Sequence, residues 1–390
     1  MIKRYKYLVL IFSLFLLIFF ISCDVGNKDQ QKIKTAEKNE WHDLTIWNIE
    51  PDSALDVLCL LNSLSGDSFY MRFYEDDFQY LKKQFTPETE KAIASLTDKV
   101  RIKNKKIISA QLTLYFSSVN PTTIEDLLYF LRNSDEIETK MKKTTYYDKS
   151  DMKLFKDIIP ELTIIFSFLK EIGFFNYWKE NKLPNINKKI RELENYAKKY
   201  NIIAEIESML GHPIKSDTLD VKLLYYTKPH GIRITGTRFI NAVDWPFEIL
   251  VRTAIHELMH PPYDFENDKE LREALLQLKN DEFIMDKVIN HNPMFGYNTF
   301  EGFIEENVVQ AMDQIITEKF DIHREPHKRW LENDDGMHVF APALYKILKE
   351  DYSTSKEKIR DILIKEILTG KLKPGNIQSV YNEFYSNYKN

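Results

Sequence analysis

The residues best suited to chemistry lie in one pentapeptide, His256-Glu257-Leu258-Met259-His260. Residues four apart lie on the same face of a helix, so both imidazoles can bind one ion. Glu257 is rotated by about 100° from His256 around such a helix and would face the water beside the metal. This pattern is typical of a zinc site in which the glutamate acts as general base. We therefore predict Zn²⁺ as the cofactor, His256 and His260 as two ligands, and Glu257 as the catalytic base.

The residues that follow the motif help to identify the third ligand. A continuation HxxGxxH would require glycine at position 263 and histidine at 266, where the chain has Tyr263 and Glu266. Segment 299–305, TFEGFIE, instead offers acids on a second expected helix. Its EGF run, which begins at Glu301, resembles the NEGFA segment of zinc aminopeptidases and the EGLAE segment of related bacterial gluzincins. In those enzymes the first glutamate binds zinc, so the resemblance implies Glu301 as the third ligand.

The gluzincin resemblance covers about residues 219–348 and extends to a neighbouring acid. In thermolysin-like members, the acid four residues after the third ligand hydrogen-bonds a zinc-binding histidine, which implies this role for Glu305. Glu305 or Glu306 could replace Glu301 as the ligand, and Glu266 is a more distant alternative. An acidic helix face that is merely solvated is the alternative that needs no metal.

A donor that stabilises the oxyanion of the transition state is also expected. Segment 333–338, NDDGMH, resembles the DNGGVH segment of thermolysin-like peptidases, whose histidine points at that oxyanion. The resemblance implies His338 as a catalytic residue, with Tyr345 and Tyr297 as substitutes. The alternative is a surface turn with an exposed histidine.

Two segments before the motif have the composition of strands. Residues 219–227 and 231–243 are rich in β-branched and aromatic side chains, and Lys228-Pro229-His230-Gly231 between them is typical of a turn. We predict a strand hairpin. The resemblance implies that its strand 233–242 is the edge that pairs with substrate backbone, with Asn241 and Ala242 as substrate-binding residues.

The remaining segments favour helices that would carry these groups. Thr86-Pro87 and segment 120–124 are expected to begin helices, and further helices are expected at 153–170, 187–200, 202–210, 269–288, 299–320, 341–350, 355–368 and 377–388. The fold class is therefore α+β and predominantly helical, and the resemblance implies a zincin-like metallopeptidase domain that holds a small antiparallel sheet. We place that domain at 212–390, after a helical region at 41–211 that would build the other wall of the cleft.

The first residues indicate targeting. Three basic residues precede an apolar run from Leu8 to Ile21, whose 14 residues are fewer than the roughly 18 needed to span a bilayer. The ending Phe20-Ile21-Ser22-Cys23 resembles a bacterial lipobox. It implies a signal peptide at 1–22, lipidation at Cys23, a flexible tether at 23–40, and a lipid-anchored protein of the bacterial cell envelope that faces the periplasm or the exterior. An uncleaved N-terminal anchor is the alternative.

Composition narrows the classes of function. The 390 residues include 54 basic and 59 acidic ones, which gives a net charge of −5. A chain with this charge lacks the positive field typical of nucleic-acid binding. Two cysteines exclude a disulfide scaffold. We expect a zinc metallopeptidase with peptide or protein substrates and membrane contact through the lipid. The alternative is a surface lipoprotein that binds a partner and has a structural or silent metal site.

Overall fold

The computed structural model describes residues 41–144, 146–292, 295, 297–353, 355, 357–386 and 388. Residues 39–390 form one compact unit. Most of its described residues are helical, and the strands form one small mixed sheet, so the prediction of a predominantly helical α+β chain is confirmed. The expected signal peptide, tether and Cys23 lie outside the described residues.

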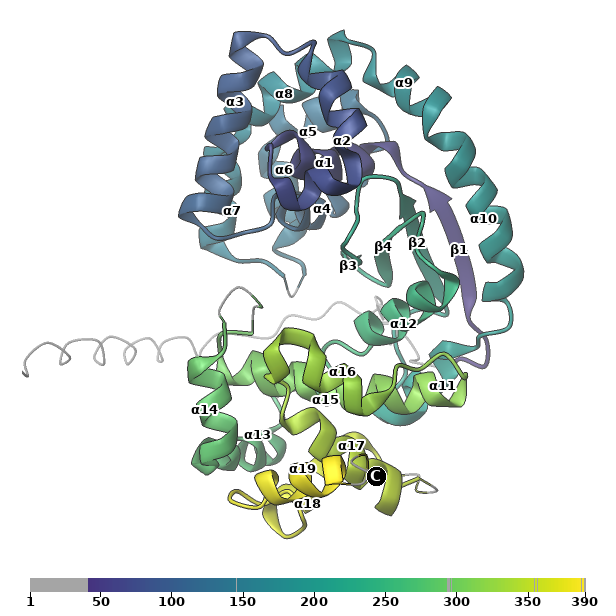
Figure 1. The fold of residues 1–390 in the computed structure, drawn as a ribbon, viewed down its shortest axis with the longest axis vertical. Helices are drawn as coiled ribbons and strands as arrows, with labels where there is room; N and C mark the ends of the chain where they lie inside the picture. Colours follow the sequence, from purple (N-terminus) through teal and green to yellow (C-terminus); the bar gives the residue numbers. More distant parts are fainter. Residues whose placement is uncertain are drawn as a thin grey trace, which may run out of the picture. The chain divides into compact units, whose positions relative to one another are not determined.

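The elements follow the chain in the order shown in Figure 1. The strands are β1 Ile46–Pro51, β2 Thr218–Leu224, β3 Ile232–Arg233 and β4 Arg238–Ala242. The helices before β2 are α1 Ser53–Leu64, α2 Ser68–Lys82, α3 Pro87–Thr97, α4 Ile108–Ser117, α5 Ile124–Arg132, α6 Ser134–Met141, α7 Lys149–Asp157, α8 Ile159–Glu171, α9 Phe174–Asn181, α10 Leu183–Ala197 and α11 Ile202–Leu210. Those after β4 are α12 Phe247–Leu258, α13 Lys269–Gln277, α14 Glu282–Asn290, α15 Phe300–Lys319, α16 Pro326–Glu332, α17 Phe340–Asp351, α18 Ile359–Leu368 and α19 Ile377–Ser386. Short helical turns are η1 Asp98–Lys103, η2 Leu278–Asn280 and η4 Asn333–Gly336.

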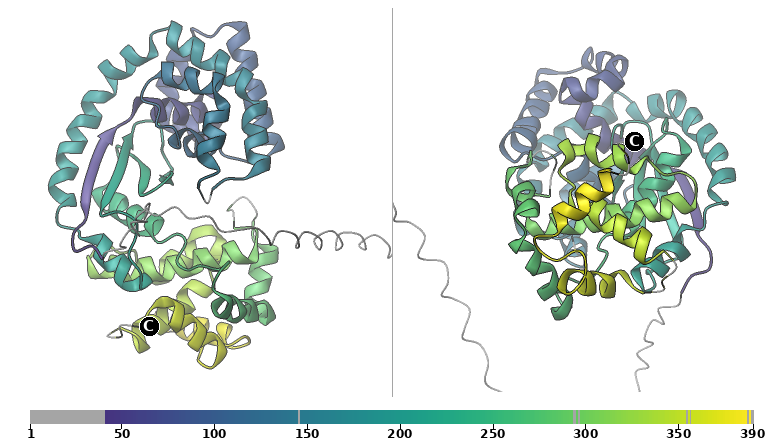
Figure 2. Two further views of the ribbon diagram at one scale, coloured as in Figure 1. Left: turned by 180° about the vertical axis from the view of Figure 1, so that it is seen from behind. Right: turned by 60° about the horizontal axis from the view of Figure 1, so that its bottom comes forward.

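The sheet joins parts of the chain that are far apart in sequence. Its strand order is β1-β2-β4-β3, in which β1, β2 and β4 are parallel and β3 is antiparallel to β4. Strand β1 pairs with β2 from Ile46 opposite Thr218 to Pro51 opposite Leu223. Helix α10 lies along β1, as Figures 1 and 2 both show. The region at 41–211, which we expected to be helical throughout, thus contributes a strand to the sheet.

The hairpin predicted between 219–227 and 231–243 is wrong. Strands β2 and β4 run parallel, and the antiparallel pair is instead β3 with β4, which are joined by a turn where Gly236 has φ +79°. Strand β4 is therefore interior, with Asn241 opposite Leu223 of β2. Only the short β3 lies at this edge of the sheet, because the tight turn after Arg233 breaks the long predicted strand in two.

Several helix boundaries follow the local signals of the sequence. Thr86 caps α3 by accepting a hydrogen bond from Thr89 N, and Thr123 caps α5 in a capping box with Asp126. The single helix expected at 153–170 is divided at Ile158 into α7 and α8. The division places Pro160 in the first turn of a new helix, where its missing N–H costs no helical hydrogen bond.

One buried carboxylate ties the helical region to the sheet. Asp56 of α1 is fully buried and accepts hydrogen bonds from Trp178 Nε1 at 2.6 Å, from Tyr225 N at 3.0 Å and from Tyr226 N at 2.6 Å. The two tyrosine amides directly follow β2, so their protons are bound by α1 and not by a hairpin partner. This contact holds the chain in the course that leads to β3.

Replacing this carboxylate should destabilise the protein strongly. Asp56→Ala leaves three buried donors without an acceptor, and each costs about 1–3 kcal/mol, so we expect a loss of about 3 kcal/mol or more. Urea unfolding followed by circular dichroism measures the change. Asp76→Ala, at an exposed position of α2, should change stability by no more than about 0.5 kcal/mol. Equal effects of the two variants would contradict the assigned role.

The loop between β2 and β3 is fixed to α2 by a histidine. His230 Nε2 lies 3.0 Å from the Tyr70 hydroxyl, and burial lowers the pKa of His230 to about 4. In the unfolded chain the pKa of histidine is near 6.5. As the pH falls from 6.5 toward 4, the unfolded chain binds a proton that the folded chain does not bind, so stability is lost.

We therefore expect acid to destabilise the wild type more than His230→Gln. The difference should grow as the pH falls and should reach up to about 3 kcal/mol near pH 4. Urea unfolding of both proteins at several pH values between about 7 and 4.5 tests this. Parallel pH dependences would show that His230 does not remain neutral in the folded protein.

Among the described residues, no helix combines the length and the apolar character that crossing a membrane requires.

Candidate metal centre

Helix α12 presents the first part of the site. Its apolar side chains at 247, 250, 251, 254, 255 and 258 are buried, and this stripe fixes which face the helix turns inward. His256 and Glu257 lie in its last turn, and His260 follows two residues after its end. The guanidinium of Arg233 donates to the carbonyl oxygen of Glu257 at 2.6 Å and also to that of His260. Strand β3 thereby caps the end of the helix that carries the motif.

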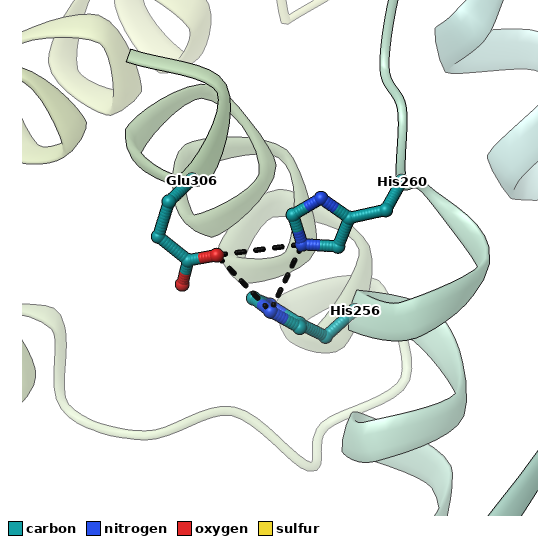
Figure 3. A group of neighbouring side chains, drawn as sticks. All are labelled: His256, His260 and Glu306. Carbon is teal, nitrogen blue, oxygen red and sulfur yellow. Dashed lines mark hydrogen bonds and ion pairs between the residues drawn. The ribbon is translucent and has the colours of Figure 1, made fainter. Parts of the chain in front are cut away.

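Helix α15 packs against α12 and supplies the acids. Glu306 is only 3% exposed, and its Oε2 lies 3.6 Å from His256 Nε2 and 3.4 Å from His260 Nε2. Figure 3 shows the three side chains pointing toward one another. The structure thus brings together both predicted histidines and Glu306, which the sequence had left as an alternative ligand.

Glu301, the ligand implied by the resemblance, lies elsewhere. It is in the first turn of α15, where its side chain is 43% exposed and pairs with Lys279 at 3.1 Å. Glu306 is five positions after Glu301, which corresponds to a rotation of about 140° around the helix axis. The helix face that meets the imidazoles is therefore the one with Glu306. Glu266 is outside the cluster of converging ligand atoms.

Two further carboxylates fix the imidazole rings from behind. Asp313 Oδ2 is 2.8 Å from His256 Nδ1, and Glu305 Oε1 is 2.9 Å from His260 Nδ1. The Glu305 contact is the one that the resemblance implied for this residue. Arg329 of α16 in turn forms a two-pronged ion pair with Asp313, with Nη2 to Oδ2 at 2.7 Å. A carboxylate that accepts the Nδ1 proton leaves the Nε2 lone pair available for a metal.

The three inner atoms have the spacing that a tetrahedral ion requires. The two Nε2 atoms are 3.3 Å apart, and the distances to Glu306 Oε2 are 3.4 and 3.6 Å. Ligands bound tetrahedrally at about 2.0–2.1 Å would lie about 3.3–3.4 Å apart. Glu306 Oε2 is buried and has no hydrogen-bond partner among the described residues. Two imidazole lone pairs and an anionic oxygen that face one another repel unless a cation lies between them, so the donors fit a Zn²⁺ ion.

The surrounding carboxylates favour positive charge at this point. Burial alone would lower the pKa of His256, but the charges of Glu306 and Asp313 outweigh it and raise that pKa well above its ordinary value. Burial raises the pKa of Glu306, but the attraction of the two imidazoles outweighs it and holds the pKa of this carboxyl well below its usual range. Glu257 behaves differently, because burial raises its pKa above the ordinary value although both imidazoles oppose this.

The cluster of His256, His260 and Glu306, the metal group, opens into a pocket of about 210 Å³. Glu257 lines this pocket beside His256 and Glu306. Gly231 contributes backbone to the wall, and a Cβ atom there would lie 2.8 Å from Thr253 Cγ2, so only glycine allows the loop to approach α12 this closely. The arrangement leaves room for a small ligand next to the converging donors.

Two tyrosines come close to the acids of the site. Tyr297 lies near Glu306, and its pKa is raised first by burial and then by the charge of that carboxylate. Tyr146, in the loop between α6 and α7, has its pKa raised by burial, and the charges of Arg233 and Glu257 also act on it. The helical region at 41–211 therefore approaches the site through Tyr146.

Other residues singled out in the sequence have different surroundings. His338 is only 1% exposed, and its ring nitrogens contact Asp334 Oδ2 at 3.0 Å and Asn307 Nδ2 at 3.4 Å. Tyr345 donates to Glu318 at 2.5 Å. Asn241 and Ala242 are buried within the sheet, at 1% and 0% exposure, so their side chains face the protein interior and do not face a substrate.

The sequence analysis did not identify Asp313 and Arg329. Asp313 lies seven residues after Glu306, which is close to two helical turns and puts both acids on one face of α15. That spacing was available in the sequence, but it points to Asp313 only after Glu306 is chosen over Glu301. Arg329 belongs to another helix, and no local pattern links it to Asp313.

Metal binding should distinguish the two glutamates. Glu306→Gln removes the charged oxygen between the imidazoles, and we expect zinc affinity to fall by at least about 100-fold. Glu301→Gln changes an exposed residue of the same helix and should retain about one zinc per chain. Competition with a chromogenic chelator, together with elemental analysis, measures both. The assignment of Glu306 fails if Glu301→Gln is the variant that loses zinc.

The chain matches no family model, no curated protein and no solved structure.

Proposed function

We propose that the protein is a zinc-dependent peptidase of gluzincin type with a zincin-like domain. His256, His260 and Glu306 hold the metal, and Glu257 is the general base. The observation that carries the proposal is the convergence of three metal-binding atoms at 3.3–3.6 Å, with an unbound carboxylate on the same pocket wall. Three protein ligands with space beside them are the arrangement of a catalytic zinc site.

The role of Glu257 follows from its position and its pKa. A bound zinc ion would polarise the scissile carbonyl and lower the pKa of water toward neutrality. Glu257 accepts the proton of the attacking water and delivers it to the leaving amine. Its raised pKa suits this exchange, because a base whose pKa is nearer to neutral can both take and release a proton.

Tyr297 is the better donor for the developing oxyanion. Its hydroxyl is near enough to Glu306 for the charge of that carboxylate to raise its pKa, whereas both ring nitrogens of His338 already have polar neighbours. A phenol kept protonated by its raised pKa can donate a hydrogen bond to negative charge on the substrate. In this proposal Tyr297 takes the role that the resemblance implied for His338.

Strand β3 would guide the substrate. It lies at the edge of the sheet, and its Arg233 is bound to the end of the helix that carries the motif. An extended peptide can pair with such an edge through its backbone. We propose that this edge, and not Asn241 with Ala242, binds the substrate backbone.

The proposal includes the cellular location of the reaction. The lipobox-like segment at Cys23 supports a lipid-anchored protein of the bacterial cell envelope that acts on peptides or proteins. The alternative, a partner-binding lipoprotein with a structural metal, requires a fourth protein ligand. Among the described residues, the cluster of possible ligands consists of His256, His260 and Glu306 alone, which favours the enzyme.

Removing the base should separate chemistry from metal binding. Glu257→Gln keeps the shape of the pocket and all three ligands, so we expect about one zinc per chain. Hydrolysis of a peptide mixture, followed by mass spectrometry of new termini, should fall by at least about 100-fold, since a general base contributes roughly 10²–10⁴-fold. Unchanged hydrolysis in this variant, or failure of the wild type to bind zinc, would disprove the proposed function.

A further inference from the structure

Three arginines line the pocket beside the metal group. Arg252 comes from α12, Arg329 from α16, and Arg324 from the loop that precedes α16, and all three line the same 210 Å³ pocket as His256 and Glu306. The uncharged part of the lining is polar and includes Thr253, Gln310 and Thr317. Arg329 holds Asp313 in place, but the proposed hydrolysis does not explain Arg252 and Arg324.

Much of the hydrogen-bonding capacity of the cluster is unused. Arg329 is held by Asp313, and Arg252 Nη1 donates to the carbonyl oxygen of Ile322 at 3.0 Å. The Nε atoms of both arginines are nevertheless buried and donate to no acceptor within the described part of the chain. Arg324 is an exposed residue, and its guanidinium has no acidic partner among the described residues. Positive charge is therefore only partly neutralised here, and an anion in the pocket would approach Arg324, for which the described residues offer no acceptor.

The charges that line the pocket leave a positive excess once zinc is bound. Three arginines and four acids, Glu257, Glu306, Asp313 and Asp334, give a balance of −1 (3 − 4), and the Zn²⁺ of the proposed function would make it +1. Burial, together with the repulsion of Arg329 and Arg252, lowers the pKa of Arg324 to about 10. An excess of one charge matches one carboxylate better than a doubly charged phosphate. Guanidinium groups bind carboxylates through paired hydrogen bonds, which adds geometric selectivity.

We infer that this arginine pocket binds a carboxylate of the substrate, close to the peptide bond that is cut. The inference rests on the proposed function and specifies its substrate class: peptides with an acidic group near the scissile bond. The pocket is smaller than the roughly 300–1,000 Å³ of sites for drug-sized ligands, so it suits one short side chain or a chain end. The carboxylate is either that of an Asp or Glu side chain or that of the C-terminus.

A matched pair of small probes tests the pocket without any cleavage. Succinic acid monohydroxamate carries a metal-chelating hydroxamate at one end and a carboxylate at the other. Its carboxamide counterpart differs only in that the second group is neutral. Calorimetric titration of the zinc-loaded protein with each probe should show about tenfold tighter binding of the carboxylate, because a charge-assisted hydrogen bond contributes on that order.

Variants test whether the arginines cause the difference in affinity between the two probes. In Arg324→Gln the two probes should bind with similar affinity, and Arg252→Gln should reduce the difference in the same direction. Arg191→Gln, at an exposed position of α10, is the matched control and should retain the tenfold preference. Equal affinities in the wild type, or a preference that survives both pocket variants, would overturn the arginine pocket while the metal site stands. Failure of both probes to bind would overturn the metal site and the inference with it.

Peptide digestion then distinguishes the two sources of the carboxylate. Zinc-loaded protein is incubated with one mixed peptide library that has free C-termini and with the same library amidated. Cleavage beside Asp or Glu in both libraries identifies a side chain as the ligand. Cleavage at a fixed distance from the end, and only in the free library, identifies the C-terminus. Cleavage that ignores both kinds of carboxylate contradicts the inference.

Discussion

The architecture of the site depends on two hydrogen bonds that hold the imidazoles from behind. Asp313 and Glu305 each engage an Nδ1 atom, so both Nε2 atoms are turned toward Glu306. Three electron-rich atoms then lie within 3.6 Å of one another in a largely buried place. With both imidazoles neutral, the lone pairs and the charge of Glu306 repel, so the arrangement needs positive charge: a proton on an imidazole, which the raised pKa of His256 favours, or a metal ion. A cation bound between the three atoms replaces this repulsion with attraction.

Helix α15 connects the metal group with the arginine pocket. Glu306, Gln310 and Asp313 on this helix all line the pocket, and Arg329 joins α16 to them through Asp313. Most of the helix is buried, so its rotation about its axis is fixed by packing on several sides. Ligand binding, ring orientation and the proposed recognition of a carboxylate therefore depend on the register of one helix.

Short sequence patterns predicted the parts of the structure that depend on interactions between residues close together in the chain. The pentapeptide at 256–260 indicated the paired imidazoles, and the caps at Thr86 and Thr123 indicated helix starts, because each depends on residues within a turn or two. The choice between Glu301 and Glu306 depended on how α15 rotates against α12, which packing of the whole helix decides. The parallel pairing of β2 with β4 was not predictable either, because the course of the chain after Leu224 is set by contacts of Tyr225 and Tyr226 with the distant Asp56.

Strand β1 also constrains the order in which the molecule can assemble. Its residue Asn48 meets Asp220, which is 172 positions later, so on the ribosome the first strand emerges long before its partner exists. Until then its backbone groups are an open edge that can pair with other chains. Contacts that span so much sequence also slow folding. A fragment that begins at residue 212 would leave the edge of β2 that β1 covers without a partner in the same way.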